Sequence, residues 1–285
     1  SVGASGTPHV VSVANLGAST LTGGLYLQGQ TNLTVSGAIS AVGVEIDTGA
    51  NSLTVSNPIA SGAGNLTLTA DTLSIGANLS GTGVLTLQPS TAGRLVSIGV
   101  AGAQFDLTDG EIGFLQNGFS SITIGRNTSG AVTIDTAAFV DPVTIASGST
   151  VTLNAGLPTL STTQDNAGIT IIANGTISVN GAISANGTGA VTLTATGGSS
   201  NIALGADVQS VFNGTLTLTA GQHITRTAGT LGAAGSSSLL VLSAAGSIGS
   251  SGQAVATDVG TIRASAGGDI YISEANAVQL GDGIG

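Results

Sequence analysis

The sequence predicts an all-β solenoid, a parallel β-helix whose coils each hold about 20–25 residues and three short strands. Three observations lead to this prediction. Apolar residues alternate with small polar residues over short stretches, turn-forming residues follow each stretch, and one eight-residue phrase returns at a fixed spacing. The phrase is LTVSGAIS at 33–40, LTVSNPIA at 53–60 and LSIGANLS at 73–80.

Each phrase begins with a strand whose side chains point alternately to the two faces of a sheet. Leu33, Leu53 and Leu73 follow one another at intervals of 20 residues, so we expect them to stack in one inward column. The residues after these leucines would form an outward column: Thr34, Thr54 and Ser74. After each strand, Gly, Asn, Ser or Pro turns the chain.

A further apolar patch completes each period and predicts the third strand of the coil. The patches in the first periods are VEID at 44–47, LTLT at 66–69 and LTLQ at 85–88. The pattern resumes later with longer turns, at intervals of 24 or 25 residues. The later segments are ISVNGAIS at 177–184, IALGADVQ at 202–209, VTLT at 191–194, LTLT at 216–219 and LVLS at 240–243.

Other repeat architectures do not fit this pattern. Ankyrin and TPR repeats would show helical periodicity, hairpin sheets would show periods of about 8–12 residues, and leucine-rich repeats would show an Asn at a fixed offset. The architecture that fits is a stack of coils in which equivalent residues lie about 4.8 Å apart.

The stretch 94–145 departs from the rhythm and holds four of the five phenylalanines. Its TDGE segment at 108–111 places Thr and Glu at capping-box spacing, so we expect one helical turn there. We therefore predict a single β-helical rod over residues 1–285, with a loop and short-helix excursion within 100–145. The four phenylalanines are Phe105, Phe114, Phe119 and Phe139.

Composition excludes several functions. Charged residues make up 6 % of the chain, against roughly 25 % in ordinary globular domains, and the net charge is −10. Nucleic-acid binding needs clustered Lys and Arg, so we expect no nucleic-acid partner.

No apolar run reaches the about 18 residues that a transmembrane helix needs, and no signal peptide is visible. Both ends of the sequence are typical of the middle of a longer protein. The absence of Cys excludes disulfides and thiolate metal sites.

The segment DLTDGEIGFLQNGFSSITIG at 106–125 resembles a unit of large filamentous-haemagglutinin-like exoproteins. The eight-residue phrases are similar to the shaft repeats of the same family. The resemblance implies a right-handed β-helical rod, secretion through an outer-membrane partner, and an adhesive or toxic tip elsewhere in the full-length protein. The residues that fit the unit are Leu107, Glu111, Ile112, Leu115, Ile122, Ile124 and Gly125.

The family's secretion domain carries NPNL- and NPNG-type tetrapeptides. The nearest segment here, residues 57–60, reads NPIA and does not match them. The resemblance therefore covers the shaft of such a protein and not its secretion domain or its tip.

Candidate chemical groups are few and scattered. His9 and His223 are the only imidazoles, and neither has another His or a Cys near it in the sequence. Glu45 is expected to face Thr67 in the next coil, and Thr86 one coil further on, so it gains no carboxylate partner. We predict no catalytic, cofactor-binding or metal-ligating residues and no cofactor; calcium bound by an Asp in a turn stays open. The other carboxylates considered are Asp47, Asp71, Asp106, Asp109, Glu111, Asp135 and Asp141.

Rows of outward threonines suggest the regular Thr-x-Thr arrays of ice-binding β-helices. We expect the rows to be broken by Glu45, Asp47, Gln88 and Gly76, which favours ordinary solvated strand residues on an outer face. Glycosylation is possible at Asn-x-Ser/Thr sequons, which begin at Asn32, Asn65, Asn78, Asn127, Asn174, Asn186 and Asn213.

The favoured hypothesis is a structural and interaction protein: the rod of a secreted or cell-surface bacterial fibre, an adhesin or a component of extracellular matrix, and not an enzyme. Its partners would be extracellular surfaces, other copies of itself or matrix components. One alternative is a filament subunit that stacks head to tail. Others are a β-helical carbohydrate-active enzyme and an ice-binding protein.

Overall fold

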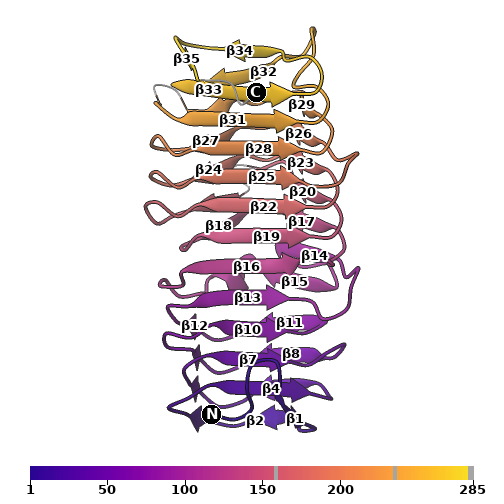
Figure 1. The fold of residues 1–285 in the computed structure, drawn as a ribbon. Coiled ribbons are helices and arrows are strands. Elements are labelled where there is room, and N and C mark those ends of the chain that lie inside the picture. Colours follow the sequence, from indigo (N-terminus) through magenta and orange to yellow (C-terminus); the bar gives the residue numbers. More distant parts are fainter. Residues whose placement is uncertain (157–159, 234–235, 282–285) are drawn as a thin grey trace.

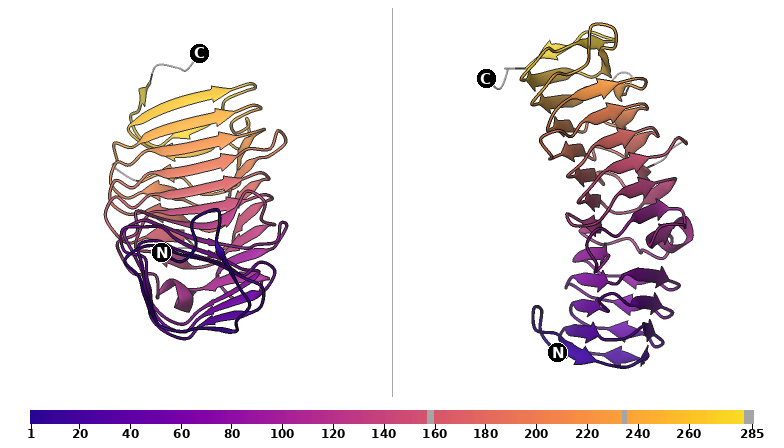
Figure 2. Two further views of the ribbon diagram at one scale, coloured as in Figure 1. Left: turned by 60° about the horizontal axis from the view of Figure 1, so that its bottom comes forward. Right: turned by 90° about the vertical axis from the view of Figure 1, so that its right-hand side faces the viewer.

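The computed structural model describes residues 1–156, 160–233 and 236–281, which form a parallel β-solenoid of about 12 turns. The prediction of an all-β solenoid with three strands per coil is confirmed, with about 22 residues per turn and three parallel sheet faces. Figures 1 and 2 show the coils stacked along one axis into an elongated body, with the first and the last described residues at opposite ends of the stack.

The first face is one unbroken sheet of 13 parallel strands, which pair in chain order. At a spacing of about 4.8 Å between neighbours, 13 strands span roughly 58 Å. Its strands are β1 (His9–Val11), β4 (Leu25–Gly29), β7 (Val44–Asp47), β10 (Leu66–Thr69), β13 (Val84–Gln88), β16 (Ser121–Arg126), β19 (Val143–Ser147), β22 (Ile169–Ala173), β25 (Val191–Ala195), β28 (Leu216–Ala220), β31 (Leu239–Ala244), β33 (Thr261–Ala266) and β35 (Gln279–Leu280).

The second face consists of a four-stranded sheet followed by a seven-stranded sheet. The four strands are β2 (Asn15–Leu16), β5 (Leu33–Val35), β8 (Ser52–Val55) and β11 (Thr72–Ile75). The seven strands, in spatial order, are β15 (Phe105–Thr108), β14 (Val96–Gly99), β17 (Val132–Ile134), β20 (Val151–Leu153), β23 (Ile177–Val179), β26 (Ile202–Leu204) and β29 (Ile224–Arg226).

The third face is divided in the same way into four and seven strands. The four strands are β3 (Ser19–Thr20), β6 (Ile39–Ser40), β9 (Ile59–Ala60) and β12 (Leu79–Ser80). The seven strands are β18 (Ala137–Phe139), β21 (Leu160–Thr162), β24 (Ile183–Ala185), β27 (Val208–Ser210), β30 (Leu231–Gly232), β32 (Val255–Asp258) and β34 (Ile272–Glu274).

The predicted columns on the second face are present. Leu53 pairs in register with Leu33 on one side and Leu73 on the other, and all three are at most 3 % exposed. Thr54 pairs likewise with Thr34 and Ser74 on the outer surface. Each coil thus presents apolar layers to the coil above and the coil below, so that an internal coil is covered only when both neighbours are in place.

The rhythm changes where the four-stranded sheets give way to the seven-stranded sheets. After β13 the chain forms β14, returns through residues 100–104, and forms β15 parallel to β14, with Val96 opposite Phe105. Gly99 begins this return with φ +84°, and a Cβ there would lie 2.3 Å from the Thr136 carbonyl oxygen. One coil therefore contributes two strands to the same face.

A four-residue helix, α1 (Asp109–Ile112), follows β15 and leads towards the third face. Thr108 caps it: the Thr108 hydroxyl accepts from the Glu111 N–H, and the Glu111 carboxylate accepts from the Thr108 N–H, which is the predicted capping box. Glu111 also accepts a hydrogen bond from the backbone N–H of Ile75 at 2.9 Å. The carboxylate thus joins α1 to β11, the last strand of the four-stranded sheet.

Candidate functional surface

The two histidines lie far apart in the fold and have different surroundings. His9 is exposed on β1. His223 lies at the corner just before β29, where its Nδ1 accepts a hydrogen bond of 2.9 Å from the Ser247 N–H. Within the described residues, no group of three or more His, Cys, Asp or Glu side chains could hold a metal ion.

Glu45 lies on the outer surface of the 13-stranded sheet, as the register predicts. It pairs with Tyr26 on β4 and with Thr67 on β10, so both in-register neighbours are uncharged. A single carboxylate with these neighbours lacks the second carboxyl group that glycoside hydrolysis requires.

Asp71 lies at the corner after β10 and is 3 % exposed. Its oxygens accept hydrogen bonds from the Thr91 N–H at 2.7 Å and the Thr91 hydroxyl at 2.6 Å, and the Arg94 guanidinium lies 3.6 Å away. Burial favours a higher pKa for Asp71, but the hydrogen bonds from Thr91 and the charge of Arg94 outweigh burial, so the pKa is lowered from its ordinary value. These contacts tie one coil to the next.

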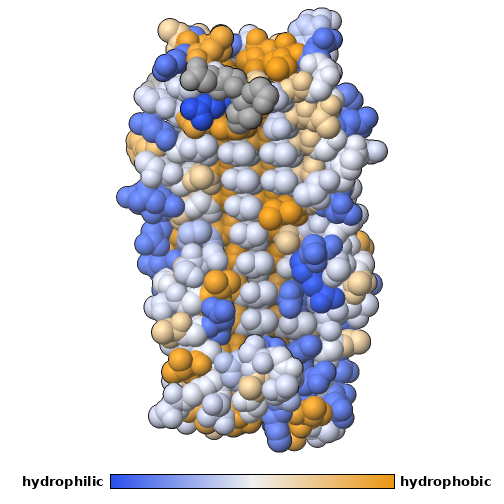
Figure 3. Space-filling model, in the orientation of Figure 1, coloured by the Kyte–Doolittle hydropathy of each residue, from blue (hydrophilic) through white to orange (hydrophobic). Residues whose placement is uncertain are grey.

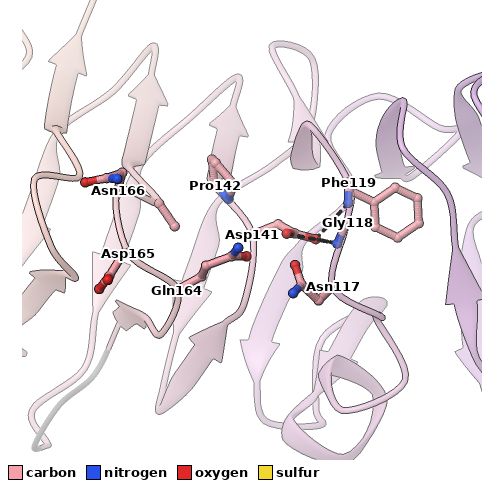
Figure 4. A pocket seen from close by; sticks show the side chains of 9 residues that line it. Asn117, Gly118, Phe119, Asp141, Pro142, Gln164, Asp165 and Asn166 are labelled. Carbon is pink, nitrogen blue, oxygen red and sulfur yellow. Dashed lines mark hydrogen bonds between the residues drawn. The ribbon is translucent and has the colours of Figure 1, made fainter.

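A polar pocket of about 240 Å³ lies where three coils pass from the third face to the first. Figure 4 shows its buried carboxylate, Asp141, directed towards the backbone of Gly118 and Phe119. The Asp141 oxygens accept hydrogen bonds from these two N–H groups at 3.0–3.2 Å. The carboxylate therefore has a structural task that leaves it poorly placed to act on a substrate. The remaining lining residues are Asn117, Pro142, Gln164, Asp165, Asn166 and Ala167.

The most regular surface of the molecule is the outer side of the 13-stranded sheet. Seven consecutive strands, from β10 to β28, place a threonine in register with a threonine on each neighbouring strand. All seven are partly exposed. We call this set the threonine column: Thr67, Thr86, Thr123, Thr144, Thr170, Thr192 and Thr217.

A second outward column runs beside it, two residues further along each strand. None of its residues is ionisable, and two of them, Thr69 and Gly125, are buried. At β10, β25 and β28 the two columns together form Thr-x-Thr pairs. Figure 3 looks onto this side and shows pale residues of intermediate hydropathy aligned in straight columns along the middle of the body. The members of the second column are Thr69, Gln88, Gly125, Ala146, Ile172, Thr194 and Thr219.

The expectation that the threonine rows are interrupted is wrong for this column. Glu45 precedes the column instead of dividing it, because it pairs with the first threonine, Thr67. In the neighbouring column the expectation is confirmed, because Thr69 lies in register between Asp47 and Gln88. Gly76 follows β11 on the second face. A signal for the column was present in the sequence: an apolar–Thr–apolar triplet occurs in each of the seven strands.

Comparisons with known proteins do not identify a family for the chain. The chain matches no protein-family model, and neither the search of curated proteins nor the search of solved structures found a similar protein. Among the described residues, no helix is long and apolar enough to cross a membrane.

Proposed function

We propose that this chain is the rod of a secreted or cell-surface bacterial fibre, an adhesin or a matrix component, which holds a binding element away from the cell. The observation that carries the proposal is the 13-stranded sheet, in which β13 pairs directly with β16 although residues 89–120 lie between them in the chain. A continuous ladder of parallel strands resists bending, because each coil is hydrogen-bonded to both neighbours over the full height.

The surface chemistry supports the same role. Charged residues make up 6 % of the chain, and the outer strand positions are mostly Thr, Ser and other small side chains. The resemblance of residues 106–125 to filamentous-haemagglutinin-like exoproteins points to an outer-membrane secretion partner for the full-length protein. Its other partners would be extracellular surfaces, matrix components or further copies of the chain.

In this proposal the function of the rod is mechanical and not catalytic. Three of the buried or partly buried carboxylates, Asp71, Glu111 and Asp141, accept hydrogen bonds from backbone N–H groups and so have structural roles. A polysaccharide lyase or hydrolase would need such groups free in a groove.

Two measurements test the proposal. Antibodies raised against the purified chain should label intact cells of the producing bacterium, and mild external proteolysis should remove the label. Release of reducing sugars from a polysaccharide panel by the purified chain, or labelling only after the cells are lysed, would contradict the proposal.

A further inference from the structure

We propose that the threonine column and the column beside it form an ice-binding surface. The column offers seven hydroxyl groups and seven methyl groups at the strand spacing of about 4.8 Å, over a length of roughly 29 Å. No ionisable side chain stands among these positions or among their neighbours in the second column.

The hydroxyl groups of the column are available to solvent. Within the described part of the chain, none of the seven makes a hydrogen bond to a protein atom, whereas the Thr91 and Thr108 hydroxyls elsewhere are engaged by carboxylates. Each hydroxyl can donate one hydrogen bond and accept two. Because Thr is β-branched, its χ1 angle is restricted, so little side-chain entropy is lost when an ordered ligand binds.

The occupant is inferred from the period and the chemistry of this surface. The oxygen lattice of hexagonal ice repeats along one axis at a distance within about a tenth of the spacing between strands. A single Thr hydroxyl binds liquid water as well as it binds ice, so one residue gives no preference. Seven groups in register bind an ordered lattice together, because the same lattice satisfies all of them at once.

The second column contributes to the same fit. Side chains two residues apart along a strand are separated by about 6.7 Å, so the two columns form a two-dimensional grid and not a single line. Most members of the second column, such as Ala146 and Thr194, are small enough to leave the threonines accessible. Methyl groups from both columns can occupy gaps in an ordered water layer without charged groups that would disturb it.

Other occupants fit less well. A sugar polymer is usually held by an aromatic ring or by carboxylates and Arg, and the column between Thr67 and Thr217 contains neither. A charged polymer finds no counter-charge there. A second copy of the chain would meet an identical row of hydrated hydroxyl groups, with little apolar surface to bury.

The test uses the purified chain and one substitution in the centre of the column. Thr144 is the fourth of the seven threonines, and Thr144→Lys places a long hydrated cation there. The matched control is Thr152→Lys, in which the substituted threonine is also partly exposed and lies between Thr133 and Ser178 on the second face. Circular dichroism and thermal melting establish that both variants are folded.

We expect the unsubstituted chain and Thr152→Lys to shape ice crystals and to give thermal hysteresis in a nanolitre osmometer. We expect Thr144→Lys to lose both effects while remaining folded. Absence of ice shaping by the unsubstituted chain, or equal loss in the two variants, overturns the proposal. A dimer in sedimentation that Thr144→Lys alone dissociates overturns it as well, because the column would then bind a second copy.

Discussion

The Glu111 carboxylate accepts a hydrogen bond from the backbone N–H of Ile75, a residue 36 positions earlier in the chain, at 2.9 Å. The other oxygen of the same carboxylate accepts from the Thr108 N–H at 2.9 Å and from the Thr108 hydroxyl at 2.8 Å. One side chain therefore caps α1 and also satisfies an N–H at the edge of β11. The short helix is the joint at which the four-stranded sheets meet the seven-stranded sheets.

Replacing Glu111 with Ala should destabilise this joint. The N–H groups of Ile75 and Thr108 would lose their acceptor, and an unsatisfied buried donor costs about 1–3 kcal/mol. We expect faster amide hydrogen exchange at Ile75 and in α1, with little change in the last coils, because coils are coupled to their neighbours.

Asp109→Ala is the matched control for that experiment. Asp109 is an exposed carboxylate on the same helical turn, so its removal should change the free energy of unfolding by no more than about 0.5 kcal/mol. Equal effects of the two substitutions would show that the Glu111 contacts contribute nothing specific.

Acid should weaken the corner that contains Asp71. Its folded-state pKa is lowered, so the unfolded chain takes up a proton at a higher pH than the folded chain does. The stabilisation is therefore fully present above the unfolded-state pKa of about 3.9 and is lost as the pH falls through the folded-state pKa.

Asp71→Asn tests this sign. The variant should melt at a lower temperature than the parent at pH 7, and the difference should shrink as the pH is lowered below about 4. The exposed Asp269→Asn serves as the control and should show no such convergence. A difference between Asp71→Asn and the parent that grows on acidification would contradict the prediction.

The 20-residue period was sufficient to align the coils at 33–79 because those coils have equal lengths. Further along, the neighbours of the threonine column are 37, 21 and 26 residues apart, from Thr86 to Thr123, Thr144 and Thr170. Turns tolerate insertions at small entropic cost, so strand register is preserved while residue counts drift. Counting by a fixed period therefore missed a column that the apolar–Thr–apolar triplets mark.

The contacts at the joint were less accessible to sequence reasoning. The TDGE spacing predicted the capping box at Thr108 and Glu111, because both partners lie within four residues. The bond from Ile75 to Glu111 depends on the way in which β14 and β15 share one face, and parallel strands joined by only five residues are unusual. The periodicity of the sequence does not predict such a short connection between parallel strands.

A chain of side-chain acceptors links the coils at the corner before β23, β26 and β29. Thr176 Oγ1 accepts from the Asn201 N–H at 3.2 Å, Asn201 Oδ1 accepts from the His223 N–H at 2.9 Å, and His223 Nδ1 accepts from the Ser247 N–H. His223 is thus bound in the tautomer that carries its proton on Nε2.

Substitutions at His223 should follow acceptor chemistry. His223→Asn repeats the residue that performs this task one coil earlier and should leave exchange at the Ser247 amide nearly unchanged. His223→Leu keeps the bulk without an acceptor, so it should cost about 1–3 kcal/mol locally and accelerate that exchange. If Asn and Leu behave alike, the imidazole contributes by packing and not by accepting a hydrogen bond.

The stacked leucines permit the most direct test of the register. Leu53 is fully buried between Leu33 and Leu73, so Leu53→Asp places a carboxylate where neither neighbour can pair with it. The cost is several kcal/mol, or the group stays protonated at neutral pH. Thr54→Asp puts the same group on the outer surface one residue away and should change stability by less than about 1 kcal/mol.

Because coils stabilise only their neighbours, hydrogen exchange should show Leu53→Asp loosening residues 33–79 while strands β25–β31 remain protected. Equal damage from the two substitutions, or loss of protection along the whole chain, would mean that the inward column is misidentified or that the stack unfolds as one unit.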